Sequence, residues 1–333
     1  MKYSDINTIV KAHIEANDNQ TTFLIKGSPG CGKSALGTEL SQAYTFDNVV
    51  DMNLSMLDIP DAAGLYFPDK ETGALKFYAS PLLTRLQTGR NLLILDEFAD
   101  ASIQMQNLGR RILWTREING EKLSPETFVI AMSNRTIDKS GAGKLSGKVR
   151  NAVSQIEMES NLDDWVDWAM TKGNIDPVLI QFLRFKPNLL DQYNADAETS
   201  PTPRQWELVN RVPESLPMHL FFEDVKSKVG EGAAAEYAAF RKIYASLVSF
   251  EDVVMNPTGV PIPKDLSAQY AIVGSVAHNV SPTTIERVAT FVDRMSPDFG
   301  VMFWNDSIKK TPALKTTKPF IKWATSSSNV VLS

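Results

Sequence analysis

The sequence has 333 residues, of which 43% are hydrophobic and 22% charged, close to the average of globular proteins. The net charge of −5 excludes a globally basic surface for nucleic acid or anionic membranes and leaves room only for a local basic groove. The single cysteine, Cys31, excludes a disulfide framework. No apolar stretch is long enough to span a bilayer and the N-terminal segment does not resemble a signal peptide, so we expect a soluble cytoplasmic protein.

Apolar runs alternate with helical or loop segments over the first 160 residues. A helical spacing of apolar residues predicts a first helix over residues 4–15. Strands are predicted at residues 23–25, 49–52, 92–95, 128–132 and 156–158. Strands that alternate with helices favour a parallel sheet covered on both faces. We therefore expect an α/β domain over residues 1–160.

Two insertions in this region have the pattern of β-hairpins. Residues 65–67 and 75–78 are apolar runs that flank a turn-rich stretch. Residues 116–118 and 121–123 flank Asn119-Gly120, a strong two-residue turn signal. Each insertion is expected to form its own small two-stranded unit.

From residue 162 onward the pattern becomes helical, and we expect an α-helical domain over residues 161–333. Helices are predicted at residues 162–171, 176–185, 203–212, 231–249 and 282–295.

Residues 27–34 read Gly-Ser-Pro-Gly-Cys-Gly-Lys-Ser, the G-x-x-x-x-G-K-[ST] pattern of a phosphate-binding loop. The loop follows a predicted strand and opens a helical stretch, so its backbone N–H groups and the helix dipole converge on phosphate. Lys33 is expected to reach the β- and γ-phosphates, and Ser34 to ligate Mg²⁺. Cys31 is interpreted as a small residue at a variable loop position, with a redox switch as the alternative. The candidate nucleotide-binding residues are Gly27, Ser28, Pro29, Gly30, Cys31, Gly32, Lys33 and Ser34.

An apolar strand at residues 92–95 ends in two carboxylates, Asp96 and Glu97. Asp96 is expected to hold Mg²⁺ through water or through Ser34. Glu97 is placed to polarise the attacking water as a general base. The alternative, a buried strand ending in two solvated acids, loses weight beside a phosphate-binding loop.

Three further polar residues occupy informative positions. Asn134 ends the strand at residues 128–132, where it could contact the γ-phosphate or orient the water. Arg150 precedes the fifth strand and is a candidate for insertion into a neighbouring subunit's site; the alternative is a solvated basic loop. Arg204 follows a Thr202 cap and Pro203, in a first turn whose dipole disfavours a cation. That placement predicts a phosphate partner, and the alternative is a merely exposed arginine.

The order of these features resembles the AAA+ ATPases and, more narrowly, their MoxR group, including MoxR-like proteins encoded by bacteriophages. The match covers about residues 1–215, and the hairpin at residues 65–78 corresponds to an insertion in the family's second helix. Arg150 departs from the family pattern because Asn151 follows it where phenylalanine is common. Lys144 and Lys148 are therefore rivals for the same role.

The resemblance implies a P-loop NTPase with a five-stranded parallel sheet flanked by helices, followed by an α-helical lid domain with a C-terminal extension. It implies ATP and Mg²⁺ as ligands and hydrolysis of ATP to ADP and phosphate. Asn134 would be the first sensor, Arg150 the finger acting in trans and Arg204 the second sensor. Members of the family form homo-oligomeric rings, usually hexamers, and often act with a partner that carries a von Willebrand A domain. A phage-infected host cell or a bacterium is the implied setting.

Two functions of different classes follow from this pattern. The first is an ATP-driven motor or chaperone-like activator that remodels a protein client, which the acidic net charge favours. The alternative is a nucleic-acid motor or loader, which a basic stripe along a central pore would favour. A third hypothesis is a nucleotide-gated switch with very slow hydrolysis, and the presence of Glu97 argues against it.

Overall fold

The computed structural model describes residues 1–138, 145 and 147–326. The chain divides into two compact units. The first comprises Met1–Asn161 and Tyr193–Ala197, and the second comprises Leu162–Gln192 and Glu198–Ser333. None of the helices within the described ranges combines the length and apolar character that crossing a bilayer requires.

The first unit is built on a five-stranded parallel sheet with strand order β2-β5-β8-β1-β9. The strands are β1 (Phe23–Gly27), β2 (Asn48–Asn53), β5 (Asn91–Asp96), β8 (Thr127–Asn134) and β9 (Ser154–Met158). Each strand contains the segment predicted for it, so the expected fold class is confirmed. The interior strands β5 and β8 are buried almost throughout, as expected for a parallel sheet covered on both faces.

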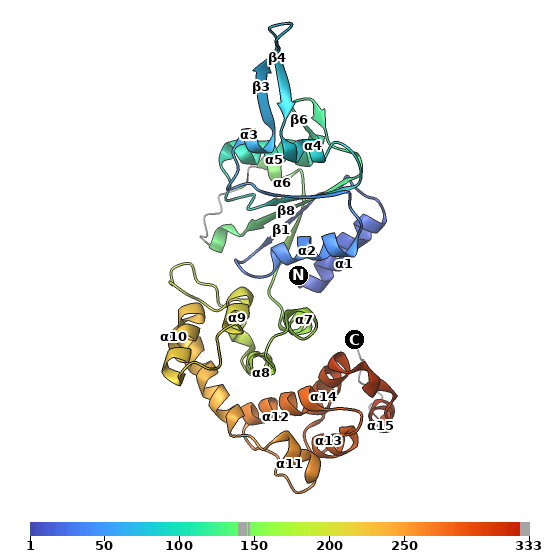
Figure 1. Cartoon of the computed structure of the whole chain (residues 1–333), viewed down its shortest axis with the longest axis vertical. Coiled ribbons are helices and arrows are strands. Elements are labelled where there is room, and N and C mark those ends of the chain that lie inside the picture. The colour runs from blue at the N-terminus through green and yellow to red at the C-terminus, as the bar shows by residue number, and fades with distance from the viewer. Residues whose placement is uncertain (139–144, 146, 327–333) are drawn as a thin grey trace. The chain divides into compact units, whose positions relative to one another are not determined.

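Helices cover both faces of this sheet (Figure 1). They are α1 (Tyr3–Glu15), α2 (Lys33–Ala43), α4 (Pro81–Arg85), α5 (Ile103–Thr115) and the short α6 (Gly147–Arg150). Phe23 and Ile25 of β1 join a core cluster with residues of α1 and α2, whereas Leu24 joins a second cluster with residues of α4 and α5. This alternation along one strand shows how the sheet buries both of its faces.

Both predicted hairpins are confirmed. The first consists of β3 (Gly64–Pro68) and β4 (Leu75–Ala79), follows the short α3 (Ile59–Ala62) and projects away from the sheet (Figure 1). The second pairs β6 (Glu117–Ile118) with β7 (Glu121–Lys122). Asn119 and Gly120 between them have φ of 52° and 89°, and a two-residue hairpin turn of this type requires such left-handed values.

The second unit is helical, as predicted. Its described helices are α7 (Leu162–Trp168), α8 (Pro177–Phe185), α9 (Pro203–Val209), α10 (Met218–Ala245), α11 (Phe250–Met255), α12 (Leu266–Asn279), α13 (Ile285–Val292), α14 (Pro297–Lys310) and α15 (Lys318–Ser326). A π-helical turn, η2 (Ala169–Gly173), extends α7, and two short 3₁₀ turns in this unit are η3 (Pro187–Leu189) and η4 (Pro312–Thr316). The 3₁₀ turn η1 (Thr136–Asp138) follows β8 in the first unit.

The helix expected at residues 231–249 is confirmed in part. Gly230, with φ of 80° and ψ of 166°, is non-helical and divides α10, so a helical segment follows Gly230 as predicted and ends at Ala245. The sequence pattern does not predict the preceding segment, which begins at Met218. The helix α12 was not expected at all. Its buried residues lie on several sides, so no one-sided apolar stripe marks it in the sequence.

The start of α9 follows the sequence prediction and leads into the core of the second unit. Thr202 Oγ1 accepts a hydrogen bond from Gln205 N at 3.3 Å, with Pro203 in the first turn. Trp206 is 0% exposed, and its Nε1 donates to Leu189 O at 2.7 Å. Its ring meets Phe182 edge-on at a centroid distance of 5.5 Å.

Trp206→Phe is expected to destabilise the protein by roughly 2 kcal/mol, because it leaves a small cavity and a buried carbonyl without its donor. Trp114→Phe is the matched control, since Trp114 on α5 is 66% exposed. Urea unfolding followed by far-ultraviolet circular dichroism would measure both. Equal midpoints for the two variants would contradict the anchoring role of Trp206.

Candidate functional site

The phosphate-binding loop spans the turn from β1 to α2. Gly30 and Gly32 have φ of 79° and 108°, a left-handed backbone that other residues rarely adopt. A Cβ on Gly27 would lie 2.6 Å from Cys31 Sγ and 2.9 Å from Met158 O, so only glycine fits there. Cys31 is buried under the loop, at 8% exposure, which favours its interpretation as a small structural residue over a redox switch.

Lys33 connects this loop by hydrogen bonds to the end of β8. Its buried Nζ donates to Gly27 O and Ser28 O at 2.9 Å each, and to Asn134 Oδ1 at 3.0 Å. A buried ammonium group needs such oxygen partners. The structure therefore brings together two residues that the sequence predicted separately, the loop lysine and the polar residue that ends β8.

Asp96 ends β5 beside the loop. Ser34 Oγ donates to Asp96 Oδ2 at 3.3 Å. A hydroxyl and a carboxylate are hard oxygen ligands of the kind that Mg²⁺ prefers. The described residues contain no group of three or more acidic, histidine or cysteine side chains that could hold a metal alone. Mg²⁺ therefore fits this pair only together with water or phosphate oxygens.

Glu97 leaves β5 with φ of 51°, an uncommon conformation for a residue other than glycine. Its backbone N donates to Asp96 Oδ1 at 2.8 Å. Its carboxylate accepts a hydrogen bond from the hydroxyl of Ser55, whose own backbone N donates to Asn53 Oδ1. Strained backbone of this kind concentrates at functional sites. Ser55, in the loop after β2, is a contact that the sequence did not predict.

Asp100 is a third carboxylate near the loop that the sequence analysis missed. Its Oδ2 accepts from Asn134 Nδ2 at 3.5 Å. Burial and, next, the Glu97 carboxylate raise the pKa of Asp100, against the opposing effects of Lys33 and Asn134. Its position three residues after Glu97 was the available signal, since acids in the turn after a strand share that strand's edge.

Arg150 lies at the end of α6, just before β9, and is exposed. Its backbone O accepts from Gln155 Nε2 at 3.3 Å. Its side chain therefore lies at the surface of the first unit, and its action on another subunit stays a prediction. Of its two rivals, Lys148 also lies in α6, and Lys144 lies outside the described residues.

Arg204 lies in the second unit, in the first turn of α9, and its side chain is exposed. Its role as a phosphate sensor stays a prediction.

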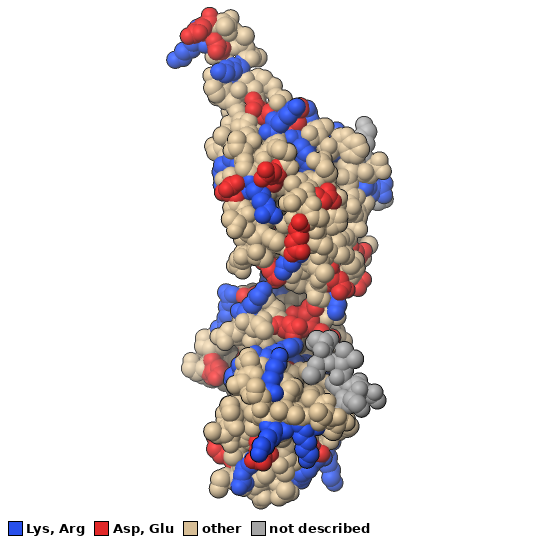
Figure 2. Space-filling view, turned by 90° about the vertical axis from the view of Figure 1, so that its right-hand side faces the viewer, with Lys and Arg blue, Asp and Glu red and all other residues tan. Residues whose placement is uncertain are grey.

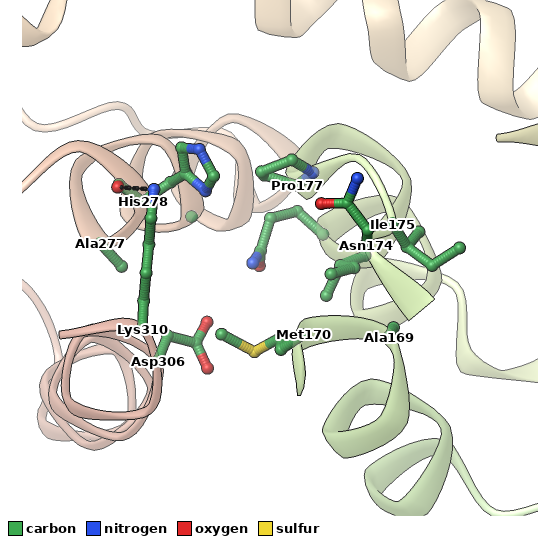
Figure 3. A pocket seen from close by; sticks show the side chains of 12 residues that line it. Ala169, Met170, Asn174, Ile175, Pro177, Ala277, His278, Asp306 and Lys310 are labelled. Atoms are coloured by element: carbon green, nitrogen blue, oxygen red, sulfur yellow. Dashed lines mark hydrogen bonds between the residues drawn. The ribbon is translucent and has the colours of Figure 1, made fainter. Parts of the chain in front are cut away.

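The second unit contains a cavity of about 150 Å³ between η2, α8, α12 and α14 (Figure 3). Lys310 Nζ donates to His278 O at 2.5 Å, and burial lowers the pKa of Lys310. The Asp306 carboxylate accepts from Arg184 Nη2 at 2.7 Å. The charged groups that line the cavity thus already have protein partners, and none of the predicted nucleotide-binding residues lines it.

Lys33→Ala is expected to weaken binding of Mg²⁺-ATP by about tenfold or more, because a charge-assisted phosphate contact is lost. Lys26→Ala is the matched control, since the Lys26 ammonium donates to Gln155 on β9 and not to loop oxygens. Isothermal titration calorimetry would measure both affinities. An unchanged affinity for Mg²⁺-ATP in Lys33→Ala would contradict the assignment of Lys33 as a phosphate-binding residue.

No family model matches the chain, and no curated protein is significantly similar to it. Solved structures do show similarity. One is a putative ATPase from Cytophaga hutchinsonii ATCC 33406, with 12% identity over 90% of this chain and 79% of that chain and a TM-score of 0.35. Another is NtrX from Brucella abortus, with 14% identity over 90% and 67% of the two chains and a TM-score of 0.41. NtrX in complex with ADP gives 15% identity over 90% and 68%, and a TM-score of 0.40.

Proposed function

We propose that this chain binds ATP with Mg²⁺ and hydrolyses it to ADP and phosphate. The observation that carries the proposal is the bond from Lys33 to Asn134, which joins a phosphate-binding loop to the strand beside the Asp96-Glu97 pair. Lysine and hydroxyl groups from the start of α2, which follows β1, thereby meet amide and carboxylate groups at the ends of β8 and β5. A nucleoside triphosphate is the ligand class that uses all of them.

Each group has a distinct part in this chemistry. Lys33 exchanges its oxygen partners in the loop and on Asn134 for phosphate oxygens and stabilises the negative charge that develops there. Ser34 and Asp96 would hold Mg²⁺, which when bound neutralises phosphate charge. Glu97 takes a proton from the attacking water, and Asn134 orients that water or the γ-phosphate. This set of groups favours hydrolysis over mere binding.

The proposed assembly is a homo-oligomeric ring of the MoxR type, with six subunits as the expected number. The exposed Arg150 supplies its guanidinium to the neighbouring subunit's nucleotide. Arg204 senses the phosphate from the helical unit and couples that unit to the nucleotide state. Both roles use arginines that lie on the surface of their own unit.

The β3–β4 hairpin supports a protein client. Five of its large apolar residues are 46–69% exposed: Leu65, Tyr66, Phe67, Leu75 and Tyr78. Exposed apolar side chains gathered on one projecting element favour protein association. Lys70 and Lys76 alternate there with Asp69 and Glu71, and Figure 2 shows basic and acidic atoms mixed at this projecting end. This mixture favours the proposed remodelling motor or activator over the alternative nucleic-acid motor, which needs a basic surface. A partner with a von Willebrand A domain is the proposed class of client.

Glu97→Gln is expected to lower the turnover number for ATP by about 100-fold or more, because the general base is lost while the side-chain shape is kept. Binding of ATP should persist. A phosphate-release assay beside a nucleotide-binding assay would separate the two effects. Wild-type turnover in Glu97→Gln would show that Glu97 is not the base, and an inactive wild-type protein would contradict hydrolysis altogether.

Arg150→Ala and Glu97→Gln proteins are each expected to be inactive alone and to regain activity when mixed. Random assembly would then create roughly a quarter of interfaces with both groups intact, because each site is shared between adjacent subunits. Arg111→Ala, which removes an exposed arginine of α5, is the control that should stay active alone. Sedimentation with ATP would follow assembly. A monomer with full activity would rule out the ring.

A further inference from the structure

Asp100 lies in the turn between β5 and α5, and none of the roles above uses it. Its backbone N donates to Glu97 O at 3.1 Å, which fixes the turn. Its Oδ2 faces Asn134, whereas its Oδ1 is buried and has no hydrogen-bond partner among the described residues. A buried carboxylate oxygen without a hydrogen-bond donor lowers the stability of the folded protein. Its presence at this position therefore indicates a functional role for Asp100.

Asn134 lies between two groups of opposite charge. Its side-chain amide has an acceptor end and a donor end, which can exchange places by rotation. The Lys33 ammonium can only donate, and it takes Oδ1 at 3.0 Å. The Asp100 carboxylate can only accept when ionised, and it faces Nδ2 at 3.5 Å. Together, the two charges select one orientation of the amide.

We infer that Asp100 is a positioning residue for hydrolysis, which holds Asn134 through its Nδ2 and so keeps the amide aimed at the nucleotide site. This inference rests on the proposed ATPase function. When Lys33 turns to a phosphate, Asn134 loses the ammonium as its partner. Asp100 is then the neighbour that still fixes the amide, so its contribution is largest in the nucleotide-bound state.

A double-mutant cycle tests this role. Asp100→Ala should lower the turnover number for ATP by about tenfold, because the orienting contact is lost, and should change the dissociation constant of ATP less than about twofold. The double variant with Asn134→Ala should be no slower than Asn134→Ala alone, because Asp100 acts through Asn134. Asp100→Asn should keep most of the activity, since its amide oxygen can still accept from Nδ2.

Glu126→Ala is the matched control, an exposed carboxylate next to the opposite end of β8. It should leave turnover unchanged. If Asp100→Ala does not fold, as judged by circular dichroism, Asp100→Ser takes its place in the cycle, since its short hydroxyl does not reach Asn134.

Two outcomes would overturn the inference alone, provided that the wild-type protein hydrolyses ATP. One is a full-rate Asp100→Ala protein, and the other is a double variant whose loss is the product of the two single losses. A wild-type protein that binds ATP without hydrolysing it would overturn the proposed function together with this inference.

Discussion

One buried positive charge organises the proposed nucleotide site. Oxygen atoms stabilise the Lys33 ammonium inside the protein, and they include two from the loop backbone and one from Asn134. The first two hold the loop curled around the lysine, and the third ties the loop to β8. Gly27 pairs with Asn134 in the parallel register, so this arrangement requires two strands that end level. A slip of one residue in that pairing would turn the Asn134 side chain to the other face of the sheet.

The first unit could be predicted closely from its sequence, and the second only in outline. In the first unit, each strand is a short, mainly apolar run followed by glycine or a polar residue. The hydrophobic pattern and the residues that end each strand therefore indicate the same boundaries. The two hairpins were also marked by their turn residues. In the second unit, α12 is buried on several sides and shows no amphipathic stripe, and the segment of α10 before the kink at Gly230 is not predicted. Burial of this kind is a tertiary property that local periodicity does not encode.

The same contrast holds within the site. The loop and the acid pair are local motifs, whereas Ser55 and Asp100 become neighbours of Glu97 and Asn134 only through folding. Ser55 comes from the loop after the edge strand β2, 42 positions before Glu97 in the sequence. The proposed role of Arg150 requires a neighbouring subunit, and the proposed role of Arg204 requires the helical unit to approach the nucleotide. Both roles are therefore supported by the sequence position and the exposure of these arginines, and not by a contact.

The β3–β4 hairpin also has a consequence for how this protein behaves in concentrated solution. Among the residues that the structure describes, each of its strands pairs only with the other, so both outer edges present unpaired backbone groups beside exposed aromatic side chains. Such edges are templates on which a strand from another chain can add, the first step of aggregation. Lys76 lies opposite Phe67 in register, so an added strand must desolvate an ammonium group near apolar surface. Lys76 thereby opposes self-association of the protein through the edges of this hairpin.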